Sequence, residues 1–231
     1  MKKASRCLSV LLLVLFMTTL FPTVSAMNSG FSTQPLTDRE TNLFISNIDL
    51  SLLTEEPSRN PIECFDVSTD QKIAIGQNDS NKKIVCVYSN NGVFQYGYKF
   101  NCSGSFGIEW DNQNLNIYFF RSDAIMSVAP DGAVLDVRMV ENTINNNDYR
   151  NAFIHATQRS VGDKTYVIRN DMGVLNHLAS SYSQLVASDS TGETILYDVG
   201  SAQLVRHLAG LAGSLIAVLL AAIIIKRRFI S

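Results

Sequence analysis

Short runs of β-branched and aromatic residues recur along this chain in a fixed order, and this recurrence narrows the possible folds more than any other property. The first copy has such runs at residues 65–67, 72–75, 84–88 and 94–100. The same order returns about 40 residues later, at 106–110, 115–119, 124–128 and 134–140. A looser third copy has its runs at 165–169, 184–188 and 194–199. Small sheets of this kind cannot bury both faces alone, so they must stack on one another.

Turn residues stand at matching places in the copies. Gly92 follows Asn and Gly132 follows Asp, which are hairpin signals, and Asp70 corresponds to Asp111. Units of four short strands with a glycine hairpin are typical of propeller blades. We therefore expect an all-β fold, a propeller-like array of about three to four four-stranded antiparallel blades. A two-sheet β-sandwich is the alternative.

The predicted β domain spans residues 43–203 and begins with a strand at 43–53. Residues 27–42 show no apolar period, and we expect them to form a flexible leader. The unit FDVSTDQKIAIG, followed by KIVCVYSNNGVFQYGYKF, resembles a blade of the NHL-type or six-bladed propeller superfamilies. The arrangement also resembles small membrane-anchored proteins of Gram-positive, Clostridia-like bacteria. The resemblance covers residues 64–200 and implies a fold but no activity, because propellers host many unrelated functions.

The N-terminus has the pattern of a secretory signal peptide. A basic start is followed by an apolar run at residues 8–21 and by the small residues of Val24-Ser25-Ala26. We predict a signal peptide over residues 1–26, with cleavage after Ala26. An uncleaved N-terminal anchor is the alternative.

The C-terminus has the pattern of a transmembrane helix. Residues 208–225 carry no charge and would span about 27 Å as a helix, close to the thickness of a bilayer core. The basic residues Lys226, Arg227 and Arg228 follow at once and predict a cytoplasmic tail over 226–231. We therefore predict a single membrane span at 204–225 in the cell membrane, with the N-terminus outside and the C-terminus in the cytoplasm.

The predicted helix carries small residues at a spacing of four. Such a stripe lets transmembrane helices approach closely, and it consists of Ala209, Gly213, Ala217 and Ala221. It predicts association of the helix with a second copy, as a homodimer, or with another membrane protein.

Charge excludes one class of partner. Six of the 19 basic residues lie in the two termini, which leaves 13 basic residues against 21 acidic ones in between. An acidic body lacks the phosphate-neutralising cations that nucleic acid needs, so we expect no nucleic-acid partner.

Cysteine and histidine spacing indicates no metal site and no cofactor. Three cysteines follow the predicted cleavage site. A disulfide between Cys64 and Cys102 is one interpretation, and three unpaired, partly buried thiols, including Cys86, are the preferred one.

Two aromatic residues and three loop segments are candidate ligand sites. Trp110 and Tyr118 lie in a stretch crowded with aromatic residues, where not all side chains can face the core, and exposed Trp or Tyr suits carbohydrate or protein contacts. The Gly- and Ser-rich segment 102–107 is a candidate anion cradle, or else a tight linker. The Asn- and Asp-rich segments 111–114 and 145–148 carry oxygen ligands of the kind that bind calcium, but they lack the residue spacing of a calcium loop. The alternative is that these residues form turns, in which Asn and Asp are common.

The favoured function is a non-enzymatic, membrane-tethered binding, sensing or scaffold domain outside the cytoplasm that recognises a protein or glycan. One alternative is a surface hydrolase or lyase that uses the turn residues Asp70, Asp111 and Asp163. Another is a structural subunit of a membrane complex.

Overall fold

The computed structural model describes residues 27–79, 81–171 and 181–205, together with positions 173, 176, 179, 208–210, 212, 213 and 216. The predicted signal peptide and its cleavage site at Ala26 lie outside the described residues. So do two residues of the small-residue stripe and the three basic residues after it, namely Ala217, Ala221, Lys226, Arg227 and Arg228. Among the residues described, none of the helices combines the length and the apolar composition needed to cross a bilayer.

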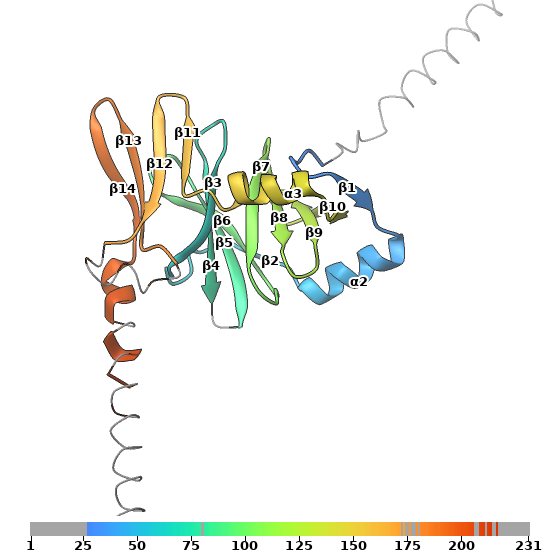
Figure 1. Cartoon of the computed structure of the whole chain (residues 1–231), viewed down its shortest axis with the longest axis horizontal. Helices are drawn as coiled ribbons and strands as arrows, with labels where there is room; N and C mark the ends of the chain where they lie inside the picture. The colour runs from blue at the N-terminus through green and yellow to red at the C-terminus, as the bar shows by residue number, and fades with distance from the viewer. Residues whose placement is uncertain are drawn as a thin grey trace, which may run out of the picture.

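The described residues form three antiparallel sheets, each containing a meander of four consecutive strands (Figure 1). The first sheet consists of β2 (Ser51–Leu53), β3 (Ile62–Val67), β4 (Ile73–Asp79), β5 (Lys82–Tyr88) and β6 (Phe94–Phe100). The second sheet consists of β1 (Thr33–Pro35), β7 (Phe106–Asp111), β8 (Asn114–Phe119), β9 (Ala124–Val128) and β10 (Val134–Val140). The third sheet consists of β11 (Gln158–Val161), β12 (Lys164–Arg169), β13 (Gln184–Asp189) and β14 (Gly192–Asp198). The prediction of a mainly β protein built from antiparallel sheets is confirmed.

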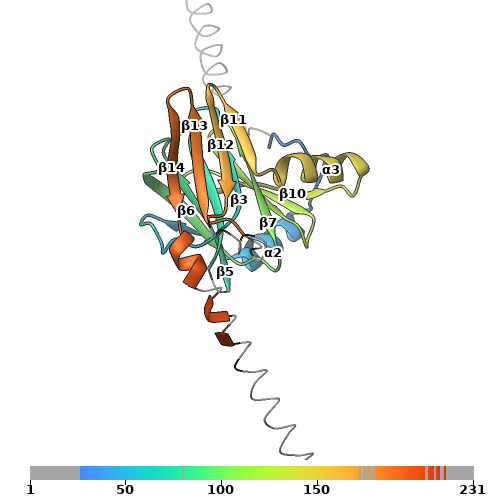
Figure 2. The ribbon, with the colours of Figure 1, turned by 60° about the vertical axis from the view of Figure 1, so that its left-hand side comes forward.

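The first sheet packs between the other two (Figure 1), and in Figure 2 the strands of the third sheet lie in front of it. One cluster of buried side chains joins the first sheet to the second and includes Val85, Tyr98 and Ile117. Another cluster joins the first sheet to the third and includes Ile75 and Tyr166. The core is therefore divided into layers on the two faces of the first sheet.

Strand β4 shows why the first sheet, which lies between the other two, is apolar on both faces. Ile73 and Ile75 belong to the cluster that faces the third sheet, and Ala74 between them belongs to the cluster that faces the second sheet. Successive side chains of a strand point to opposite faces, so a strand covered on both sides needs an unbroken apolar run. All three of these residues are at most 1% exposed.

The prediction of a flexible leader at 27–42 is wrong, because this segment is bound to the second sheet. The backbone N–H of Asn28 donates a hydrogen bond to Oδ2 of Asp111 at 2.8 Å. The hydroxyl of Ser29 donates to Oε2 of Glu109 at 2.8 Å. These carboxylates lie about 80 positions away, so no local sequence pattern reveals the contact.

The segment then crosses the second sheet and extends it. Phe31 is 6% exposed and stacks on Tyr118, with ring centroids 4.7 Å apart. Strand β1 pairs with β10 at the edge of the second sheet, and β2 pairs in the same way with β6 at the edge of the first. The third sheet ends at β14 without such an addition within the described residues.

The strand predicted at 43–53 is wrong up to Ile48, because those residues lie in the helix α2 (Asp38–Ile48), and only β2 at Ser51–Leu53 agrees with it. A capping box begins the helix: the Thr37 side chain accepts the N–H of Glu40, and the Glu40 carboxylate accepts the N–H of Thr37. Asp49 ends it in the left-handed conformation, with φ of 50°. These caps outweigh the β propensity of the apolar residues in between.

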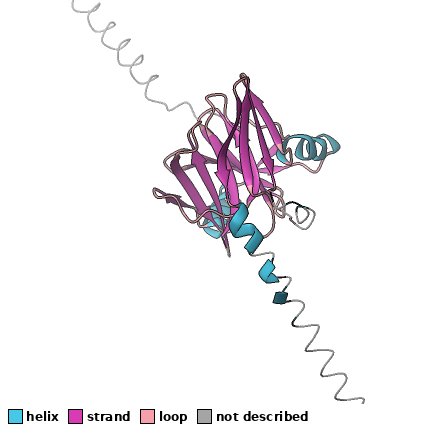
Figure 3. Ribbon diagram, turned by 90° about the vertical axis from the view of Figure 1, so that its left-hand side faces the viewer, coloured by secondary structure: helices cyan, strands magenta, loops and turns pink. Residues whose placement is uncertain are grey.

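A second helical segment covers the outer face of the second sheet (Figure 3). The helix α3 (Ile144–Tyr149) continues into a π-helical turn, η1 (Arg150–Ile154). Ile154 is buried with Tyr118 and Val140 in a third apolar cluster. This segment connects the second sheet to the third, and it covers a face that would otherwise expose apolar side chains.

A buried ion pair joins an edge strand of the first sheet to an edge strand of the third. Asp66 of β3 lies 2.7 Å from Nε of Arg159 on β11, and the two side chains are 5% and 9% exposed. Asp66 also accepts the backbone N–H of Trp110 on β7 at 2.8 Å, and Arg159 donates to the carbonyl of Phe153 at 2.6 Å. One carboxylate thus contacts all three sheets.

Candidate functional site

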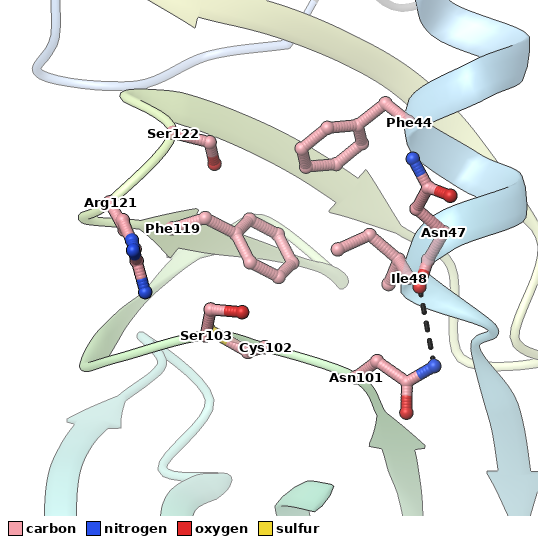
Figure 4. A pocket seen from close by; sticks show the side chains of 9 residues that line it. All are labelled: Phe44, Asn47, Ile48, Asn101, Cys102, Ser103, Phe119, Arg121 and Ser122. Atoms are coloured by element: carbon pink, nitrogen blue, oxygen red, sulfur yellow. Dashed lines mark hydrogen bonds between the residues drawn. The ribbon is translucent and has the colours of Figure 1, made fainter.

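A pocket of about 330 Å³ lies where the C-terminal end of α2 meets the loop after β6 and the turn between β8 and β9. We call it the α2 pocket. In Figure 4, α2 stands on one side of the pocket and Arg121 on the other. Its lining residues are Phe44, Asn47, Ile48, Asn101, Cys102, Ser103, Phe119, Arg121 and Ser122.

The apolar part of the pocket comes from α2 and β8. Phe44 and Ile48 lie one helical turn apart on α2, so they share a face. The ring of Phe44 meets the ring of Phe119 edge-on, with centroids 5.2 Å apart. Phe119 is 2% exposed and Ile48 is 8% exposed, so both are held firmly by the core.

The loop after β6 is fastened to the end of α2. The backbone N–H of Asn101 donates to the carbonyl of Ile48 at 2.7 Å, and its side-chain amide donates to the carbonyl of Asn47 at 3.2 Å (Figure 4). These bonds satisfy two of the carbonyl groups that a helix end leaves free. Gly104 has φ of +102°, which a side chain would oppose, and this lets the loop turn past the exposed Ser103.

The turn between β8 and β9 carries two charged residues, Arg121 and Asp123, whose side chains have different surroundings. Asp123 accepts a hydrogen bond from the hydroxyl of Tyr118 at 2.9 Å and pairs with Arg150 at 3.3 Å, on the side of η1. Arg121 lines the α2 pocket instead. Of the residues that the structure describes, none forms an ion pair or hydrogen bond with the Arg121 side chain. The α2 pocket therefore has one unneutralised cation and no carboxylate among its lining residues.

A second, smaller pocket of about 260 Å³ lies beside the other end of α2, against β10. Its charged lining residues are Asp38 and Asp136, and no basic residue lines it. Asp136 is paired with Arg138 at 2.7 Å, so its charge is balanced at the edge of this pocket.

Of the two aromatic residues predicted to bind a ligand, Tyr118 is buried and Trp110 is half-buried. Tyr118 is 1% exposed beneath Phe31, so the prediction that its ring is available to a ligand is wrong. Trp110 is half-buried, packs against the cluster between the first and second sheets, and donates its indole N–H to the carbonyl of Asp66 at 3.4 Å. The face of the second sheet that holds Tyr118 is covered by Phe31 and by Ile154 of η1. The predicted role of Trp110 stays a prediction.

The three described cysteines are free thiols. Cys64 and Cys86 are buried, and burial raises the pKa of the Cys86 thiol to about 12. Cys102 is half-buried in the wall of the α2 pocket, and burial raises its pKa as well. Cys102 is accordingly the thiol that a reagent entering the pocket meets first.

The aspartates of the predicted turns serve local structure. Asp70 accepts the hydroxyl of Ser68 at 2.6 Å and pairs with Lys72 at 2.9 Å. Asp111 is 5% exposed and binds the N-terminal segment, and Asp163 occupies the turn between β11 and β12. Within the described ranges, no group of three or more His, Cys, Asp or Glu side chains is arranged to hold a metal ion.

The helical stripe is described only in part. Ala209 and Gly213 lie in helical, exposed positions. Apart from the backbone of its own helix and its chain neighbours, none of the described atoms lies within 4 Å of where a side chain on Gly213 would begin. The prediction that this stripe packs against another helix stays a prediction.

The sequence pattern predicts one part of the α2 pocket, the Gly- and Ser-rich loop in its wall, and not the pocket as a whole. The capping signature of Thr37 and Glu40 was available to locate α2. No pattern in the sequence brings Arg121 to that helix. Comparison with protein-family models, with curated proteins and with solved structures gives no match for this chain.

Proposed function

We propose that this protein is a non-enzymatic binding module, held at the outer face of the cell membrane by its C-terminal segment, that recognises its ligand in the α2 pocket. The observation that carries the proposal is the pocket itself, with an apolar wall on rigid elements and an unpaired Arg121 opposite. Pockets of about 300 Å³ or more with a few placed polar groups are the usual form of a ligand site.

The volume of the α2 pocket limits the size of the ligand that it can hold. At about 30 Å³ per water molecule, the pocket has room for a group of roughly ten non-hydrogen atoms. That is the size of an end group of a protein or glycan, or of a small free molecule.

The tether rests on the signal-peptide and membrane-span patterns of the sequence. In support of it, residues 200–205 are helical and follow β14, and they lie toward the same end of the sheets as α2, whose C-terminal end lines the pocket (Figure 1). With residues 204–225 in a bilayer, the pocket would lie on the membrane-proximal side of the domain.

For the fold, we propose a propeller-like array of three blades. Three consecutive four-stranded meanders support it, as does the placement of both other sheets against the first. The segments that cover the outer face of the second sheet, α3 and η1, would occupy the place of a further blade.

Thiol footprinting tests the binding function on the full-length chain in detergent. We expect at least one member of a panel of short peptides, monosaccharides and small carboxylates to slow the alkylation of Cys102 by iodoacetamide. Cys64 and Cys86, which are buried, serve as internal references that react only on unfolding. If no compound changes the rate at Cys102, the pocket is not a ligand site and the proposal fails.

A further inference from the structure

We propose that the α2 pocket selects a ligand in which a carboxylate is joined to a short apolar body, with Arg121 as the counter-ion. This rests on the proposed binding function and names the chemical class of the ligand. The argument uses the charge, the hydrogen-bonding groups and the apolar wall of the pocket in turn.

The charge of the pocket favours an anion. Arg121 is exposed and forms no ion pair with any residue in the described part of the chain. Its neighbour Asp123, the nearest carboxylate in sequence, is held by Arg150 and Tyr118 on the side of η1. A guanidinium binds a carboxylate through two parallel hydrogen bonds, so a free Arg at a pocket is matched best by that group.

The uncharged polar groups of the pocket include hydroxyl groups that can donate hydrogen bonds to an anion. Ser103 and Ser122 present hydroxyl groups, and both residues are exposed. The carbonyl oxygens at the end of α2, which would attract a cation, already accept hydrogen bonds from Asn101. Satisfying these carbonyl groups weakens the negative end of the helix dipole that would otherwise oppose an anion here.

The apolar wall requires more than an inorganic anion. Phe44, Ile48 and Phe119 offer ring edges and a branched alkyl group to whatever occupies the pocket (Figure 4). Phosphate or sulfate would leave this surface in contact with water. A phenyl or short alkyl group would cover it, at about 25 cal/mol per Å² of apolar area removed from water.

Isothermal titration of the full-length chain in detergent with phenylpropionate tests the inference. Phenylpropanol has the same apolar body without the charge, and inorganic phosphate has charge without the apolar body. We expect phenylpropionate to bind about tenfold more tightly than either, because a hydrogen-bonded ion pair adds to the apolar contact. It should also slow the alkylation of Cys102.

The variant Arg121→Gln should weaken the binding of phenylpropionate by about tenfold and leave that of phenylpropanol unchanged. Arg39→Gln is the matched control, since Arg39 is exposed on the first turn of α2 and lines neither pocket. Equal affinity for phenylpropionate and phenylpropanol, or an unchanged affinity in Arg121→Gln, overturns the carboxylate assignment while the binding function stands. Equal binding of phosphate overturns the need for an apolar body. If no compound of the wider panel protects Cys102, the binding function itself fails.

Discussion

Replacing Arg159 with Met removes one partner of the buried ion pair and leaves Asp66 as an uncompensated carboxylate. The two side chains are 9% and 5% exposed, and Nε of Arg159 lies 2.7 Å from Asp66. Breaking a buried pair by removing one partner typically costs about 3–5 kcal/mol. Arg159 also donates to the carbonyl of Phe153 at 2.6 Å, and without it that carbonyl keeps only backbone donors such as the N–H of Ala156 at 3.0 Å. We therefore expect the free energy of unfolding to fall by about 4 kcal/mol at neutral pH.

The loss should depend on pH in a stated direction. Burial raises the pKa of Asp66 in the folded protein, and Arg159 opposes that rise. Without Arg159 the folded pKa rises further above the unfolded value of about 4. A carboxyl group with a raised folded pKa holds its proton in the folded state after the unfolded state has lost it. Stability therefore falls as pH rises through that window, and the penalty of Arg159→Met should be smaller at pH ~5 than at pH ~8.

Urea unfolding of the full-length chain in detergent, followed by the fluorescence of the single tryptophan, measures the effect. Trp110 is a local reporter because its backbone N–H binds Asp66. The double variant Asp66→Asn with Arg159→Met carries no buried charge at this site. We expect its free energy of unfolding to be higher than that of Arg159→Met by about 1–2 kcal/mol or more. A loss below about 1 kcal/mol in Arg159→Met, or no recovery in the double variant, would refute the assignment of this pair as a link between sheets.

Three further predictions use the same unfolding assay. Burial raises the pKa of Glu109 in the folded protein, so the contribution of Glu109 to the free energy of unfolding falls as the pH rises above about 4. Glu109→Gln should therefore make the loss of stability with rising pH less steep, and an unchanged pH profile contradicts this. Thr37→Ala removes the N-cap of α2 and should cost about 1 kcal/mol; no loss would mean that the cap is redundant. Gly92→Ala should cost more than Gly162→Ala, although both glycines have positive φ, because a Cβ at Gly92 meets the carbonyl of Leu196 at 2.8 Å while none of the described atoms lies within 4 Å at Gly162. Equal losses would show that backbone strain alone, about 1–2 kcal/mol, sets both values.

Much of the strand arrangement was predictable from local pattern. The runs predicted between residues 65 and 140 correspond to strands β3 to β10, and those of the third copy to β12, β13 and β14. Period-two alternation and turn residues depend on neighbours a few positions apart, so a single sequence contains this information. The helix at Asp38–Ile48 was missed because its apolar residues were weighed without its cap, Thr37.

The sequence by itself therefore determines the order of most strands and turns, the net charge of the segment between the two termini, and the patterns at the two ends. Tertiary packing alone determines which surfaces remain open. The contact between Asp66 and Arg159 joins residues 93 positions apart, and the placement of Arg121 opposite α2 depends on how two sheets and a helix meet. Such contacts follow from the stacking of whole sheets, in which each side chain competes for space with residues distant in sequence, and no local period records the outcome.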